Sequence, residues 1–216
     1  EQRRFKFNYD ATANFYTEDS DRNGVDHIAS LDGYLDLAKT RMELAASFAH
    51  LTGVEAESRE FQDRNLTVVS GSFEQELTAK LTLRGGANYN SSIYDTLQST
   101  EGFSARLGLT AAVTAKAWAG LAAVAGSLDS DSTGRQDYQS LLVIAGYEAT
   151  GKLKLNAEAG IQKGQTTGSS RGSDDTHFVF SMDANYQVRE KTALKLTAGM
   201  GSVSTAVLNG SATASD

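Results

Sequence analysis

A short turn built around a lysine recurs along this chain at a nearly constant interval of 36 to 41 residues. The five turns carry Lys39, Lys80, Lys116, Lys152 and Lys191, and three of them read Thr-Ala-Lys or Thr-Gly-Lys. After each lysine, apolar and polar residues alternate, which is the pattern of a β-strand with two different faces. A repeat of this length that holds two alternating runs corresponds to one long β-hairpin.

Longer polar segments lie between the lysine turns, and we expect loops at 19–24, 53–63, 91–101, 128–136 and 163–176. Short turns at one end of the hairpins and long loops at the other are typical of transmembrane β-barrels. The sequence therefore predicts an all-β fold, an antiparallel up-and-down transmembrane β-barrel, with residues 1–216 as a single barrel segment.

The alternating runs predict eleven strands, most of them longer than the mean strand of a soluble protein. A tilted strand needs about 9–11 residues to cross the hydrocarbon of a membrane. The expected strands are 3–18, 25–37, 40–52, 64–77, 80–93, 102–113, 116–128, 137–149, 152–163, 176–188 and 192–204.

Composition narrows the function classes. The chain has no cysteine, which excludes disulfides and thiolate chemistry, and a net charge of −7, which argues against nucleic acid as a partner. Proline is also absent, as suits a chain made almost wholly of paired strands. The chain contains no run of 18 apolar residues, which a membrane helix would need.

Alternation assigns most strands an apolar face, expected to contact outer-membrane lipid, and a polar face, expected to line a lumen. The run 116–128 is small and apolar on both sides, so parity does not orient it. Basic and acidic residues nearly balance on the polar face, and such charges need water or one another as partners. No ring of one sign emerges, so no ion selectivity is predicted. The charged residues predicted to line the lumen are Arg4, Lys6, Asp10, Asp26, Asp32, Asp36, Arg41, Glu43, Arg84, Arg106, Glu148, Lys154, Glu158, Asp183 and Lys195.

Aromatic residues of the apolar face collect near strand ends, as in the two aromatic girdles of a membrane barrel. Aromatic residues favour strands in any protein, so the pattern also suits a soluble fold. The residues concerned are Phe73, Tyr147 and Tyr186 near the lysine turns, and Phe15, Phe48, Tyr89 and Phe178 towards the loops.

A soluble alternative is open at this point. The same alternation fits a β-sandwich whose apolar faces point inward. It also fits a soluble or surface-anchored β-repeat adhesin whose loops bind a partner and which has no pore. The length of the strands, the strict alternation of short and long connections, and mid-strand charges on the polar face favour the membrane barrel.

Several stretches of the chain resemble a known family. The closest are 136–142, Gln-Asp-Tyr-Gln-Ser-Leu-Leu, and 147–153, Tyr-Glu-Ala-Thr-Gly-Lys-Leu, with 3–7 and 23–27 similar too. These resemble the outer-membrane β-barrel porins found beside exopolysaccharide gene clusters. The resemblance implies a bacterial outer-membrane channel, a conduit for polysaccharide or other small solutes, with no catalytic residues.

Two departures from that family stand out. Its members often place proline in the lysine turns, where this chain has none, and they continue to roughly sixteen to eighteen strands. Bacterial single-chain barrels have an even number of strands. Eleven strands therefore predict an incomplete barrel whose edges meet further strands, from missing sequence or from another chain.

The candidates for chemistry are few. His27 and His50 fall on the apolar face near the loops, and a zinc site would need about three well-placed ligands. His177 with Asp174, Asp175 and Ser173 is the one group that could suggest a protease-like rim site, but its composition is that of an ordinary polar loop. We expect no enzyme activity and no metal site.

Two loops resemble ligand motifs superficially. The glycine-rich run 163–175 lacks the Gly-Lys-Ser/Thr ending of a phosphate loop and precedes no helix. Asp129, Asp131 and Asp137 do not have the spacing or the terminal Glu of a calcium loop. No cofactor is expected.

Overall fold

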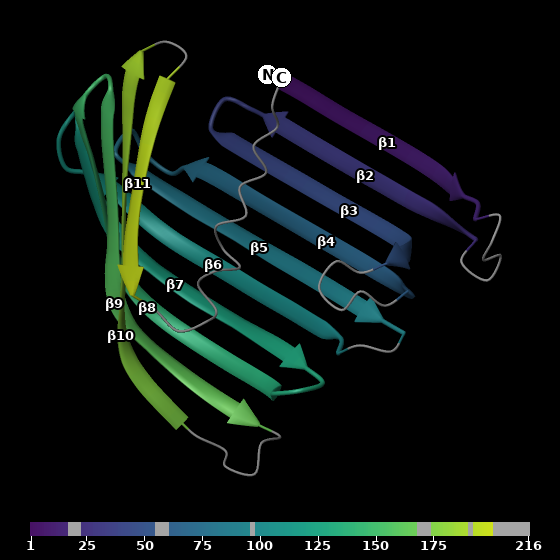
Figure 1. Ribbon diagram of the computed structural model, residues 1–216. Coiled ribbons are helices and arrows are strands. Elements are labelled where there is room, and N and C mark those ends of the chain that lie inside the picture. Colours follow the sequence, from purple (N-terminus) through teal and green to yellow (C-terminus); the bar gives the residue numbers. More distant parts are fainter. Residues whose placement is uncertain (17–22, 55–60, 96–97, 168–173, 190–191, 201–216) are drawn as a thin grey trace.

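The computed structural model describes residues 1–16, 23–54, 61–95, 98–167, 174–189 and 192–200, which form one curved antiparallel sheet (Figure 1). In these residues no helix is long and apolar enough to cross a membrane. The strands are β1 (Gln2–Asn14), β2 (Gly24–Asp36), β3 (Thr40–Val54), β4 (Phe61–Glu76), β5 (Leu81–Tyr94), β6 (Thr100–Ala112), β7 (Ala117–Ser130), β8 (Gly134–Thr150), β9 (Leu153–Thr167), β10 (Asp174–Arg189) and β11 (Thr192–Met200).

The strands lie in the sheet in chain order, and each pairs antiparallel with its sequence neighbours. This confirms the predicted all-β, up-and-down arrangement and the count of eleven strands. Within the described residues β1 pairs with β2 alone and β11 with β10 alone, so these two strands are the edges of the sheet. The prediction that both edges meet further strands stays a prediction.

Several long loops are shorter than the sequence predicted. The connection between β5 and β6 is 95–99 where 91–101 was expected, and β7 and β8 leave a connection of only 131–133 where 128–136 was expected. Gly134 has φ 72°, the left-handed conformation that glycine adopts readily in a tight turn. The alternation of apolar and polar side chains ends here because both faces become polar. The backbone hydrogen bonds between the strands do not depend on the type of side chain, so the strands continue.

At β1 the predicted strand was too long. The predicted strand reached residue 18, but the ladder between β1 and β2 ends with the pair Asn14 and Gly24. The N–H of Tyr16 instead donates to Oδ1 of Asn23 at 2.6 Å. Phe15 therefore lies beyond the strand rather than within it.

A threonine hydroxyl shapes three of the lysine turns in the same way. In each, Oγ1 accepts the N–H of the lysine two residues on and of the residue after it, an arrangement common in tight turns. The acceptors and donors are Thr78 with Lys80 and Leu81 (3.3 and 3.1 Å), Thr114 with Lys116 and Ala117 (3.1 and 3.0 Å), and Thr150 with Lys152 and Leu153 (3.2 and 3.1 Å).

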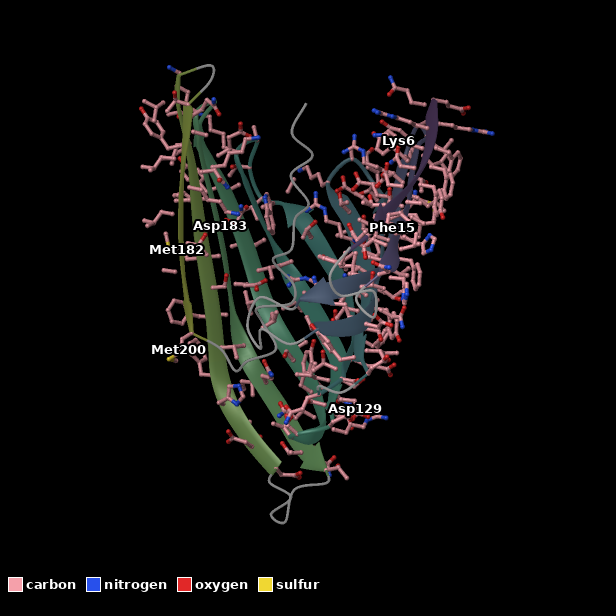
Figure 2. The ribbon with its side chains drawn as sticks, turned by 45° about the vertical axis from the view of Figure 1, so that its right-hand side comes forward. Lys6, Phe15, Asp129, Met182, Asp183 and Met200 are labelled. Atoms are coloured by element: carbon pink, nitrogen blue, oxygen red, sulfur yellow. The ribbon has the colours of Figure 1, made fainter. Side chains whose placement is uncertain are left out.

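The sheet is bent like a trough, and its two faces differ in burial. Large apolar side chains such as Phe5, Leu141 and Ile161 are exposed on what we name the convex face. The opposite, concave face holds the best-buried residues. Met182 and Asp183, neighbours on β10, point to opposite sides, Met182 outward and Asp183 into the trough (Figure 2).

The concave face carries an apolar cluster where the sheet bends. Its members are at most 7% exposed and come from β7, β8 and β10, with Trp118 and Tyr138 packed against them. Because β7 contributes to it, the structure orients the one strand that parity could not. The cluster consists of Ala122, Val124, Leu142, Ile144 and Val179.

Four aromatic rings cover a glycine directly opposite on the neighbouring strand. Such pairs hide the bare backbone of the glycine and fix strand register. At three of the four glycines an added β-carbon would lie less than 3.0 Å from an atom of the aromatic side chain. The pairs are Phe5 with Gly33, Phe73 with Gly85, Trp118 with Gly146, and Tyr138 with Gly126.

Candidate functional site

The strand register places all fifteen charged residues that the sequence assigned to a lumen on the concave face. On β3, for example, Arg41 and Glu43 lie opposite Asp36 and Tyr34 of β2. On β10, Asp183 lies opposite Asn156 of β9, whose Nδ2 donates to the carboxylate at 2.7 Å. The predicted residues therefore share one wall, although they are spread over its whole width.

Ion pairs run along this wall. Arg84 Nε lies 2.7 Å from Glu74 Oε2, and Lys154 Nζ lies 3.8 Å from Glu148 Oε1. In a third pair, Arg41 Nη2 lies 3.7 Å from Asp36 Oδ2. All are partly exposed, so each contributes little to stability, about 0–1 kcal/mol. They leave the wall hydrated and close to electrically balanced.

The pair between Arg106 and Glu158 is different because it crosses the bend. Arg106 is on β6 and Glu158 on β9, with β7 and β8 between them, yet Nη2 and Oε2 are 2.7 Å apart. Their side chains are 32% and 28% exposed. By register Arg106 lies beside Val124 and Glu158 beside Ile144, so the ion pair covers the apolar cluster. Side chains on strands that are separated by two others meet in this way only because the sheet curves towards them.

A hollow of about 450 Å³ opens on the concave wall between β4 and β8. Gly86 and Gly108 lie in its floor, and the register sets Arg84 opposite Gly108 and Arg106 opposite Gly86. Arg84 and Arg106 therefore lie diagonally across the floor of the hollow, each opposite a glycine that has no side chain. The hollow is also lined by Ser70, Asn88, Ser104, Thr110, Trp118 and Ile144.

Trp118 and Arg84 are in contact at the edge of this hollow. The guanidinium carbon of Arg84 lies 5.8 Å from the centre of the Trp118 ring, within the range of a cation–π interaction. The same guanidinium is held by Glu74, so it is fixed from two sides. The site offers an aromatic surface, fixed N–H donors and amide and hydroxyl groups, the mixture that orients a polar ligand.

Sequence reasoning missed Trp118 and Glu74 as parts of this wall. Glu74 was visible, because it precedes a lysine turn with the parity of the polar face. Trp118 stands in the alanine- and glycine-rich run where both parities are apolar, so no periodic signal could place it.

The histidines near the loops form a polar row on the convex face. The hydroxyl of Tyr9 lies 2.8 Å from Nδ1 of His27, whose ring stacks on His50 with centroids 6.3 Å apart. His50 Nδ1 in turn lies 2.9 Å from Asn65 Oδ1. This places both histidines on the apolar side, as parity predicted, at the edge of its apolar band.

The remaining candidates are not assembled into a reactive group. His177 Nδ1 lies 3.6 Å from Asp175, while Asp174 pairs instead with Lys163 at 3.4 Å. Ser173 lies outside the described residues, with the rest of 168–173 from the glycine-rich run.

The acidic loop residues have other partners. Asp131 accepts the N–H of Ser99 at 2.9 Å, and Asp137 pairs with Arg135 at 3.0 Å. In the part of the chain that the structure describes, no three His, Asp or Glu side chains are placed to hold a metal ion.

No family model and no curated protein matches this chain. Two crystal structures of the Pseudomonas putida toluene transporter TodX are similar to it at 11% sequence identity. They cover 92% and 91% of this chain and 73% and 72% of the transporter, with TM-scores of 0.43 and 0.46. At this level of likeness they say nothing about the solute of this protein.

Proposed function

We propose that this chain forms the wall of a β-barrel channel in a bacterial outer membrane, through which solutes pass without chemical change. One observation carries the proposal: the sheet has an exposed apolar convex face and a charged, polar concave face. A membrane barrel needs this combination, because lipid meets one face and a water-filled lumen meets the other.

The convex face is too apolar for contact with water alone. Phe5 is 74% exposed, Leu141 65%, Val143 60% and Leu196 67%, and these residues come from both halves of the sheet. Contiguous exposed apolar surface larger than a few hundred Å² marks a membrane or protein interface. Lipid covers such a face along its whole width.

We further propose that the solute is a polysaccharide. The support is the resemblance of 136–142 and 147–153 to exopolysaccharide-associated porins, together with the chemistry of the concave hollow. The flat ring of Trp118 suits the C–H face of a sugar ring. Arg84, Asn88 and Ser104 supply donors and acceptors for hydroxyl groups.

The test has two stages. Heat-modifiable migration on a gel and dependence on detergent would separate a membrane barrel from a soluble adhesin-like sheet. Conductance in planar bilayers, blocked by added oligosaccharides, would then report the lumen and its solute.

In the second stage Trp118→Ala should weaken block by oligosaccharides while leaving the open conductance nearly unchanged. Tyr147→Ala, on the convex face of the next strand, is the matched control and should alter neither. A protein that stays soluble without detergent and forms no pore would refute the channel. Normal pores without saccharide block would refute the polysaccharide alone.

A further inference from the structure

The lysine turns form a row of cations along one end of the sheet, and the channel function does not require them. Lys39, Lys80, Lys116 and Lys152 are all exposed at turn tips. The fifth, Lys191, lies outside the described residues. Consecutive turns are two strands apart, which spaces the lysines by about 10 Å along the rim.

The backbone fixes the position of each lysine in this row. Every one of the four carbonyls accepts an N–H from the strand that follows its own hairpin partner, at 2.8 Å. The row is therefore an ordered feature of the sheet, not a set of independent loops. The donors are Glu76 to Lys39, Ala112 to Lys80, Glu148 to Lys116 and Gln187 to Lys152.

These cations have no carboxylate of the described residues as an ion-pair partner. The acids that flank these four turns lie on the concave face, and three of them pair with other basic residues. These acids are Asp36 (with Arg41), Glu74 (with Arg84), Glu148 (with Lys154) and Glu76. The turn tips themselves are left with positive charge.

Exposed apolar side chains precede three of the lysines by three to five residues. Leu77 and Val113, at the start of their turns, and Tyr147, near the end of β8, have the parity of the convex face and are 47%, 67% and 48% exposed. A cation next to an exposed apolar or aromatic side chain is the arrangement of a membrane interface, where the ammonium reaches the headgroups. If the partner of the lysine row were an acidic soluble protein, binding would not need the exposed apolar side chains of this rim.

We propose that the lysine row binds the phosphates of anionic phospholipids in the leaflet at the short-turn end of the barrel. The proposal rests on the membrane placement proposed above. Each lysine acts as a point charge at the depth of the headgroups, and the four described turns carry four such charges along the rim. The row anchors that rim in its leaflet and selects the lipids that surround it.

The test compares lipid selectivity of the full chain in phosphatidylcholine vesicles, with and without 30% phosphatidylglycerol. Electron spin resonance of spin-labelled lipids measures how strongly each headgroup associates with the protein. Lysines near a membrane surface favour anionic lipid by about 1 kcal/mol each, about fivefold. Only one leaflet of the surrounding lipid contacts the lysine row. Averaged over the lipid of both leaflets, we therefore expect about a threefold preference for phosphatidylglycerol. This preference should be lost in high salt, which screens the charges.

Three variants make the test specific. Replacing the four described turn lysines by Gln should bring the preference close to one, while replacing them by Arg should keep it. The control removes an equal number of basic residues from the concave face and so gives the same net charge, and it should keep the wild-type preference. That control is Arg4→Gln, Lys6→Gln, Lys154→Gln and Lys195→Gln.

Unchanged selectivity in the turn variant would overturn the proposal. The lysine row would then be a binding site for an acidic protein and not for lipid. An equal loss in the control would also overturn it, since net charge alone would then explain the preference. If no sample shows lipid immobilised by the protein, the membrane placement itself fails, and this proposal fails with it.

Discussion

Replacing Val143 by lysine should separate a membrane wall from a soluble sheet. Val143 is 60% exposed on the convex face near the centre of β8, so it has little packing to lose. In a soluble protein such a surface substitution changes stability by less than about 0.5 kcal/mol. In a bilayer, lysine near the midplane of the lipid-facing surface costs about 2–4 kcal/mol.

Gln139→Lys is the matched control on the same face of the same strand. Its neighbour across the ladder, Lys163, is already a lysine on β9, so this level of the wall lies at the edge of the apolar band. Near the interface the cost of lysine falls to about 0–1 kcal/mol. The two variants carry the same new charge at different depths, and Gln139→Lys also meets the like charge of Lys163 across the ladder, which can only raise the cost of this control.

The assay is reversible denaturant unfolding of the protein in lipid vesicles, with folding followed by gel mobility. Val143→Lys should lower the free energy of unfolding by about 2–4 kcal/mol and Gln139→Lys by less than about 1 kcal/mol. If both variants stay within about 0.5 kcal/mol of the wild type, the convex face does not meet lipid and the reasoning is wrong.

Three further outcomes are expected. Thr114→Val removes the acceptor of two turn N–H groups and should cost about 0.5–1.5 kcal/mol in the same unfolding assay; no loss would mean that water replaces the hydroxyl. Gly146→Ala drives a β-carbon into an aromatic ring and should cost about 1–3 kcal/mol, whereas Gly164→Ala meets nothing within 4 Å and should be close to neutral. In intact cells a cysteine in place of Ser132 should react with an impermeant reagent and one in place of Ala79 should not, because Ser132 lies at the end of the sheet that carries the longer connections, such as 95–99, and the longer loops of such barrels face outward; the reverse pattern would invert the orientation.

Periodicity carried most of what the sequence could predict. A period of two fixed both faces of nearly every strand, and the lysine interval fixed the hairpins, because both signals are local. Alternation failed to predict the structure where odd and even positions have the same polarity. In β7 alanine and glycine occupy both parities, and at the loop ends both parities are polar, so neither the orientation nor the limits could be read there.

The concave site depends on information that periodicity lacks. Arg106 and Glu158 are 52 residues apart and meet only because the sheet curves. Curvature arises from the twist of the strands and from where small residues stand opposite large ones. The pairing of Trp118 with Gly146 is such a case, since it depends on register across two strands.

The strictly sequential order of the strands has a consequence for how this architecture can change size. Every ladder joins neighbours in the chain, so all pairings form at short sequence separation, which favours rapid assembly. Each of the four described lysine turns also accepts a hydrogen bond from the hairpin that follows it, in the same way. Duplicating or deleting one hairpin would leave the other ladders intact, so the circumference of such a wall can grow or shrink by whole hairpins without a redesign of the rest.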